Sequence, residues 1–236
     1  MIFLAQYMDI ARFIQIFLVQ GLSGLFYLFI AYRILKRESK GLNLLLSGAY
    51  LSVAFGVIIN MIYAFILIES VVRILHFLTY YLLCLSLIFL LIFVLIVDKS
   101  DKVITPKIQL VLIIAFGVLL LGLWFIPNGI IINASTEWKP EWSWTFLTFS
   151  FIICSSIAIV PTTYFSLKLY FKFENKELKK KWKYFLVGIF AYFFLFYGTT
   201  ISNTLADPTF RLIWSIASLP MLISLYFAYY GIAKQL

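Results

Sequence analysis

The sequence predicts an all-α polytopic membrane protein whose single domain, residues 1–236, is a bundle of seven transmembrane helices. Two observations lead to this prediction. Hydrophobic residues make up 64% of the chain and charged residues only 12%, whereas about 25% of the residues in soluble domains are charged. The apolar residues also form long continuous runs, which favour helices over the short alternating strands of a membrane β-barrel.

Each apolar run is long enough to cross a hydrocarbon core about 30 Å thick at about 1.5 Å per residue. Short loops separate the runs, so consecutive helices should be antiparallel neighbours. Pro161 and Pro220 fall inside the fifth and seventh helices. Each removes a backbone donor and predicts a kink, which is either tolerated packing or a hinge. The predicted helices comprise residues 10–32, 42–67, 71–97, 108–126, 144–169, 184–205 and 212–232.

The distribution of lysine and arginine predicts the orientation of the bundle. Fifteen of the 19 basic residues lie in one set of loops, and four lie in the other. Because basic loops remain in the cytoplasm, we expect the N-terminus outside and the C-terminus in the cytoplasm, with the protein in the cell membrane. The basic residues behind the net charge of +9 are then explained by their role in orienting the helices in the membrane, and no nucleic-acid partner is expected. The four residues of the minor set are Arg12, Arg73, Lys139 and Arg211.

The most basic segment follows the fifth predicted helix and reads KFENKELKKKWK. One interpretation is a loop whose charges set the topology and contact anionic lipid. The other is a docking site for a cytoplasmic signalling partner. The candidate docking residues are Lys176, Lys179, Lys180, Lys181 and Lys183.

Ionisable and amide side chains gather near the predicted outer ends of several helices. In the third helix, four polar residues are spaced by four, three and four, which places them on one helix face. We expect Arg73 and His76 to point into the bundle, where an outward-open pocket would bind a small polar or anionic molecule. The alternative is that these groups only solvate helix ends, with Arg73 reaching lipid headgroups. The candidate pocket residues are Asn60, Glu69, Arg73, His76, Tyr80, Asn203, Asp207 and Arg211.

Three tryptophans, Trp138, Trp142 and Trp144, lie between the fourth and fifth helices. They fit either an aromatic belt at the membrane interface or a lid over the outer pocket. Catalytic and cofactor-binding patterns are absent: the chain has one histidine and no HExxH or CxxC motif. We therefore expect neither enzyme activity nor a bound cofactor or metal. Cys84 and Cys154 lie within apolar runs, as expected of reduced packing residues.

The chain resembles the seven-helix sensor domain that precedes some histidine kinases. The resemblance lies in the basic segment LKLYFKFENKELKKKWKYFLVG and in the ending SLPMLISLYFAYYGIAKQL. It implies a receptor-like or sensor-like protein embedded in the lipid bilayer. Since the chain ends at Leu236 without a kinase, the expected output is a separate cytoplasmic partner. A transporter, channel or permease subunit, or a structural subunit of a membrane complex, remains the alternative.

Overall fold

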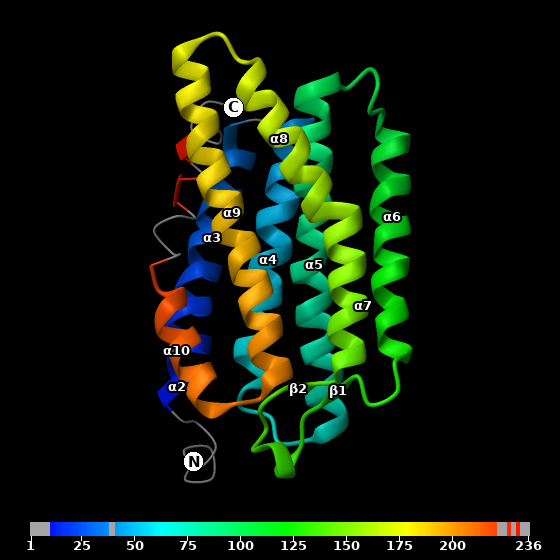
Figure 1. Cartoon of the computed structure of the whole chain (residues 1–236), viewed down its shortest axis with the longest axis vertical. Helices are drawn as coiled ribbons and strands as arrows, with labels where there is room; N and C mark the ends of the chain where they lie inside the picture. Colours follow the sequence, from blue (N-terminus) through cyan, green and yellow to red (C-terminus); the bar gives the residue numbers. More distant parts are fainter. Residues whose placement is uncertain (1–9, 38–40, 221–225, 228–229, 232–236) are drawn as a thin grey trace.

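The computed structural model describes residues 10–37, 41–220, 226–227 and 230–231 (Figure 1). Its long elements are all helices, and two-residue strands β1 (Ile130–Ile131) and β2 (Glu141–Trp142) form an antiparallel pair. The helical elements are α2 (Ile10–Phe13), η1 (Ile14–Gly21), α3 (Leu22–Arg37), α4 (Leu42–Tyr63), α5 (Glu69–Lys99), α6 (Pro106–Gly122), η2 (Leu123–Phe125), η3 (Ala134–Thr136), α7 (Trp144–Cys154), η4 (Ser155–Ile159), α8 (Val160–Lys172), α9 (Lys176–Leu205) and α10 (Pro208–Ser218).

Six stretches of the described residues are long and apolar enough to cross a membrane, and the chain is a polytopic helical membrane protein. The first stretch joins η1 to α3, and the fifth joins α7, η4 and α8 into one continuous helix. Large apolar side chains point outward along them, where lipid rather than water would cover them. The six stretches are Ile14–Lys36, Leu42–Tyr63, Glu69–Lys99, Pro106–Phe125, Trp144–Lys172 and Lys176–Leu205.

The seventh predicted helix, residues 212–232, is described only in part. α10 begins at Pro208, earlier than predicted, because the Asp207 carboxylate caps it by accepting a hydrogen bond from the backbone N–H of Phe210 at 2.6 Å. α10 ends at Ser218, two residues before Pro220. Most of the remainder, residues 221–225, 228–229 and 232, lies outside the described part of the chain.

The lysine-rich segment is helical, so its prediction as a loop was wrong. α9 begins at Lys176 instead of residue 184, because the Asn175 side chain accepts hydrogen bonds from the backbone N–H groups of Glu177 and Leu178. Lysine, glutamate and leucine are good helix formers. A hydropathy pattern marks where a helix leaves the lipid and not where the helix itself begins.

The fifth stretch bends between α7 and α8, as Pro161 predicted (Figure 1). The π-helical turn η4 ends two residues before this proline, which lies in the first turn of α8. A π-helical insertion and a proline are both established causes of helix bending.

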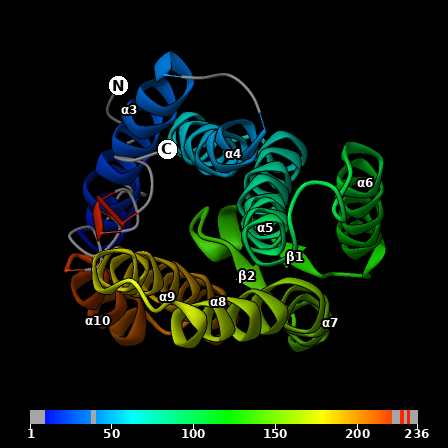
Figure 2. The same ribbon diagram turned by 90° about the horizontal axis from the view of Figure 1, so that it is seen from above.

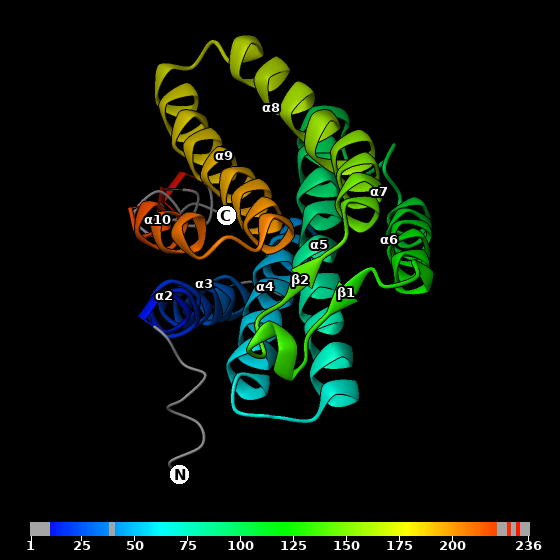
Figure 3. The same ribbon diagram turned by 60° about the horizontal axis from the view of Figure 1, so that its bottom comes forward.

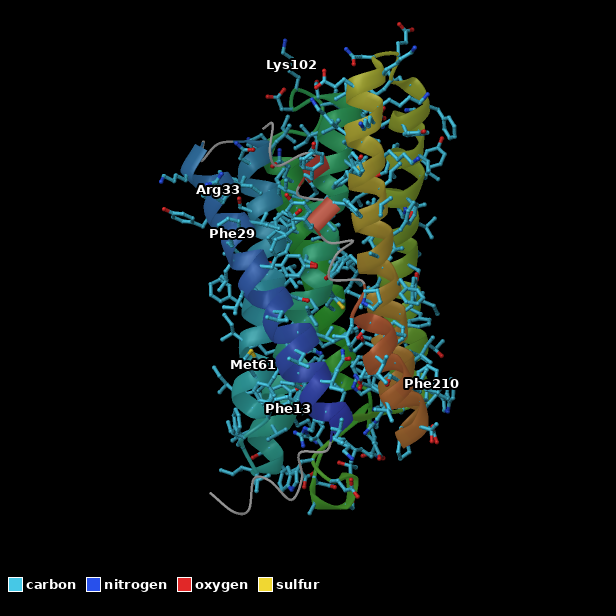
Figure 4. The ribbon with its side chains drawn as sticks, turned by 90° about the vertical axis from the view of Figure 1, so that its left-hand side faces the viewer. Phe13, Phe29, Arg33, Met61, Lys102 and Phe210 are labelled. Atoms are coloured by element: carbon cyan, nitrogen blue, oxygen red, sulfur yellow. The ribbon has the colours of Figure 1, made fainter. Side chains whose placement is uncertain are left out.

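The two ends of the bundle differ in chemistry. We call one end the hairpin end: it holds the β1–β2 pair and the α4–α5 and α9–α10 turns (Figure 1). The opposite end, the basic end, holds the α8–α9 turn, and Arg33 and Lys102 lie toward it in Figure 4. Phe13 and Phe210 lie toward the hairpin end in the same view.

Along the bundle axis, α3, α4, α5, α9 and α10 surround a common centre, whereas α6 lies outside this group (Figure 2). α5 is the central helix and packs against α4, α6 and α8. Its completely buried apolar side chains belong to the core: Val72, Cys84, Leu87, Ile88, Ile92, Phe93 and Val94.

Candidate functional site

A cavity of about 220 Å³ lies within the bundle at the hairpin end. Residues of α2, η1, α3, α4, α5, α9, α10 and the segment joining α6 to α7 line it. Along α9 the lining extends from Asn203 inward to Tyr192, which is about 16 Å at 1.5 Å per residue. The cavity therefore reaches roughly halfway through a hydrocarbon core about 30 Å thick.

A π-helical stretch forms one wall of this cavity. η1 contributes Gln15 and Gln20, and the Asn60 amide of α4 donates a hydrogen bond to the Gln20 carbonyl oxygen. The Ser218 hydroxyl of α10 donates to the side-chain oxygen Oε1 of Gln15 at 3.4 Å. π-helical turns recur at functional sites. Here the π-helical stretch carries the side-chain amides of Gln15 and Gln20, which both line the cavity.

His76 joins three elements around the cavity. The indole N–H of Trp142 donates to His76 Nε2 at 3.0 Å, and the Tyr63 hydroxyl lies 2.7 Å from Nδ1. Since an indole nitrogen can only donate, Nε2 accepts, and we assign the imidazole proton to Nδ1, which donates to the Tyr63 oxygen. The neutral imidazole thus leaves the hydroxyl proton of Tyr63 for another acceptor. All three residues line the cavity.

Trp142 attaches the α6–α7 segment to the bundle. This segment lies across the hairpin end (Figure 3) and contacts α5 and α9. Trp142 is 5% exposed and packs edge-on against Tyr80 and Phe146, with ring centroids 5.0 and 4.9 Å away. Trp138 is also buried, whereas Trp144 is 64% exposed. Only Trp144 therefore has the exposure expected of an interfacial belt, and Trp142 is a wall of the cavity.

Three basic residues line the cavity: Arg12, Lys139 and Arg211. Arg211 Nη2 donates to the Pro140 carbonyl at 2.7 Å, and Lys139 pairs with Glu137 at 2.7 Å. The cavity lining contains no aspartate or glutamate among the described residues.

One buried hydroxyl in the lining lacks a partner. Thr79 of α5 is 5% exposed, and its Oγ1 makes no hydrogen bond within the described part of the chain. Buried polar groups are nearly always hydrogen-bonded, so an exception calls for an explanation. A polar group of a bound molecule would supply the missing partner.

The structure brings together five of the eight predicted pocket residues, namely Asn60, His76, Tyr80, Asn203 and Arg211. Tyr80 also hydrogen-bonds Ser150 of α7. Asp207 is exposed and caps α10 instead of lining the cavity.

The prediction that Arg73 points into the bundle was wrong. Arg73 is exposed, and its guanidinium lies over the ring of Trp124, 5.4 Å from the centroid. Phe77, four residues later, contacts the same ring at 5.0 Å. Arg73 thus follows the side of α5 that faces α6, and Glu69, one turn nearer the helix end, is exposed too. Spacing by three and four residues places Arg73 on the same broad face of α5 as His76, but it does not say which neighbouring element each part of that face meets.

Several cavity residues were not among the predicted ones, notably Gln15, Tyr63 and Thr79. Gln15 and Thr79 are single polar residues within apolar runs, which is the signal that would have identified them. Tyr63 has no such signal, because tyrosine is common throughout this chain.

The five candidate docking lysines lie on the first two turns of α9, at the basic end. Lys176, Lys180 and Lys183 are exposed. Lys179 lies over the ring of Tyr170 at 5.0 Å, and Lys181 forms an ion pair with Glu177. The exposed lysines are far along α9 from the cavity.

Within the described residues, no group of three or more His, Cys, Asp or Glu side chains could hold a metal ion. Comparisons with known proteins gave no match: no protein-family model, no curated protein and no solved structure is similar to this chain.

Proposed function

We propose that this protein is a receptor-like membrane protein that binds a small molecule in the hairpin-end cavity and signals to a separate cytoplasmic partner. The observation that supports this most is the composition of the cavity wall. Seven helical elements and the α6–α7 segment contribute to it, so an occupant would change how these elements pack against one another.

A seventh membrane span is part of the proposal. Near the hairpin end, Gly198 of α9 lies against the Trp214 ring of α10. Near the basic end, Gly231 lies against the backbone of α9 at Lys181 and Phe185, and Phe227 stacks on Tyr184. Between these contacts α9 advances about 20 Å or more. These two sets of contacts, made by described residues at separate depths along α9, are what supports a seventh span.

The proposed orientation places the hairpin end outside and the basic end in the cytoplasm. It rests on the fifteen-to-four distribution of basic residues between the two sets of loops. The cavity then opens to the exterior, and the exposed lysines of α9 face the cytoplasm.

α9 provides a physical connection between the two proposed binding regions. It is 30 residues long, about 45 Å at 1.5 Å per residue. Asn203, Thr200 and Tyr192 line the cavity, and Lys176, Lys180 and Lys183 begin the same helix. A displacement of α9 by a bound molecule would move the lysines that we propose dock the partner.

Ligand screening with a blocked cavity tests the proposal. The variant Asn203→Phe would fill the cavity near its mouth, whereas Leu205→Phe changes an exposed residue of α9 outside it. A panel of small organic acids, amines and neutral aromatic compounds is added to purified protein, and thermal stability is recorded. We expect at least one compound to stabilise wild type and Leu205→Phe but not Asn203→Phe. If every compound acted equally on all three proteins, the cavity would not be a binding site.

The signalling half of the proposal has its own test. Replacing Lys176, Lys180 and Lys183 with glutamine should leave membrane insertion intact, since the other basic loops still set the topology. Co-purification of a cytoplasmic partner should be lost. A partner that still co-purified with this variant would exclude docking at these lysines.

One observation favours transport as a second candidate. A smaller cavity of about 30 Å³ lies deeper in the bundle and shares Tyr27, Val53 and Tyr192 with the larger one. The Tyr192 hydroxyl bonds the Ser86 hydroxyl at 2.5 Å and the Leu83 carbonyl at 2.8 Å. If this tyrosine closes a path, a compound found in the screen would accumulate in proteoliposomes, and Tyr192→Ala would change the rate. Binding without accumulation would favour the receptor.

A further inference from the structure

We propose that the hairpin-end cavity recognises its ligand through a hydrogen-bond acceptor, and that the ligand is a small, mostly apolar molecule that carries a carbonyl group. Thr79 and Tyr63 are the donors to the carbonyl oxygen. This inference rests on the proposed ligand-binding role of the cavity and adds the chemical class of the ligand.

The Thr79 hydroxyl is a buried polar group that the protein itself leaves unpaired. Thr79 lines the cavity and is 5% exposed, and its Oγ1 has no hydrogen-bond partner within the described residues. A threonine hydroxyl in a helix commonly bonds the backbone carbonyl three or four residues earlier, as Thr200 and Thr204 do on α9. Because Thr79 makes no such bond, its hydroxyl is available to a molecule in the cavity, and an acceptor oxygen there would remove the cost of burying it unpaired.

The Tyr63 hydroxyl is the second donor, because His76 fixes the role of its oxygen. The indole N–H of Trp142 donates to His76 Nε2 at 3.0 Å, so the neutral imidazole carries its proton on Nδ1. That N–H donates to the Tyr63 oxygen, 2.7 Å away. Tyr63 is 3% exposed, and its hydroxyl makes no second hydrogen bond within the described part of the chain. Its proton is therefore left for an acceptor in the cavity.

The two hydroxyls belong to neighbouring parts of the cavity wall. His76 and Thr79 are three residues apart on α5, which separates them by about 4.5 Å along the helix axis and by about 60° around it. The Tyr63 hydroxyl reaches His76 from α4, and all three residues line the cavity. A carbonyl oxygen has two lone pairs and can accept one hydrogen bond from each helix.

The remaining walls and the volume of the cavity limit the body of the ligand. Trp142, Trp214 and Phe196 provide aromatic surfaces, which prefer offset or edge-on contact with another ring. The volume of 220 Å³ exceeds the roughly 150 Å³ of a cavity that holds benzene and falls below the roughly 300 Å³ at which drug-sized sites begin. One ring with a short carbonyl-bearing chain fits this range, whereas a two-chain lipid does not.

Two probes of the same shape test the role of the acceptor: acetophenone, and α-methylstyrene, in which a CH₂ group replaces the carbonyl oxygen. Binding is measured by calorimetry on the full chain in phosphatidylcholine nanodiscs, and empty nanodiscs give the partition of each compound into lipid. The quantity compared between variants is the ratio of the two affinities, because the partition of each compound then cancels.

Thr79→Val keeps the shape of the side chain and removes its hydroxyl. We expect it to lower the affinity of acetophenone relative to α-methylstyrene about three- to tenfold. Thr162→Val is the matched control, because Thr162 of α8 is 1% exposed and its Oγ1 also has no partner within the described residues, yet it lies outside the cavity. The control should leave the ratio unchanged.

Tyr63→Phe should lower the same ratio by a similar factor. If this variant fails to fold, since the phenol oxygen also accepts the His76 N–H, Thr79→Val decides. An unchanged ratio in Thr79→Val would show that water satisfies these hydroxyls and would overturn the acceptor selection, while binding of both probes would leave the cavity as a ligand site. Equal falls in Thr79→Val and Thr162→Val would overturn it too, because the effect would then come from packing. If neither probe bound wild type beyond its partition into empty nanodiscs, the proposed ligand-binding role would fail as well.

Lipid chemistry separates two sources of a carbonyl oxygen, a small molecule and the ester group of a phospholipid. Acetophenone should bind equally well in nanodiscs of ester-linked phosphatidylcholine and in nanodiscs of ether-linked phosphatidylcholine, which has no ester carbonyl. Tighter binding in the ether-linked lipid would show that a lipid ester competes for Thr79 and Tyr63, and it would overturn the assignment of the cavity to a small molecule.

Discussion

At the scale of single residues, Trp142 shows how one side chain can make a site from an otherwise separate segment. Its N–H bonds His76, and its ring contacts Tyr80 and Phe146. Trp144, two residues later, is largely exposed. A hydropathy scale gives both tryptophans the same value. In the structure, however, Trp142 lines the cavity and Trp144 faces outward from the bundle.

This difference predicts unequal effects of the same substitution. Trp142→Phe removes the donor to His76 Nε2 and leaves a buried acceptor unpaired, which should cost about 1–3 kcal/mol of stability. Trp144→Phe should change stability by less than about 0.5 kcal/mol. Unfolding in detergent measures both. Equal midpoints for the two variants would show that the hydrogen bond between Trp142 and His76 does not contribute to stability.

At the scale of elements, α9 carries both the cavity wall and the exposed lysines, and its contact with α10 depends on one glycine. An added Cβ at Gly198 would collide with the Trp214 ring. Small residues allow such close approach between membrane helices, where packing rather than hydrophobic burial drives association. The indole N–H of Trp214 also donates to the Thr199 hydroxyl at 3.2 Å, so the contact fixes how α10 lies on α9.

Gly198→Ala should therefore destabilise the protein by about 1–3 kcal/mol through overpacking. Gly122, at the end of α6, has open space around its Cβ position and provides the control. Gly122→Ala should be neutral or slightly stabilising. Unfolding in detergent measures the effect. A Gly198→Ala protein as stable as wild type would mean that the α9–α10 contact adapts without cost.

At the scale of the whole molecule, the distribution of charge defines two chemically different ends separated by an apolar surface. The cavity opens at the end with few basic residues, and the lysines of α9 lie at the other. The proposed function requires this difference between the two ends, because the small molecule would bind at one end and the cytoplasmic partner at the other.

Cysteine labelling in intact cells tests the proposed orientation. Ser135 is exposed in η3, between β1 and β2 at the hairpin end. Lys102 is exposed between α5 and α6 and lies toward the basic end in Figure 4. Ser135→Cys should react with a membrane-impermeant maleimide, and Lys102→Cys should react only after permeabilisation. Cys84 and Cys154 are both 0% exposed, so the background should be low. Labelling of Lys102→Cys alone in intact cells would reverse the orientation.

The sequence by itself determined that this chain is a helical membrane protein, because continuous apolar runs in lipid leave the backbone few other ways to satisfy its hydrogen bonds. It located six of the predicted helices and the kink at Pro161, and it selected five residues that the cavity brings together. Only the tertiary structure decided that Arg73 lies outside the cavity, that the lysine-rich segment is helical, and that Trp142 and Thr79 line a common space. Periodicity defines a direction around each helix axis. Depth along the axis and the identity of the facing element depend on how helices pack, and those contacts join residues far apart in the chain.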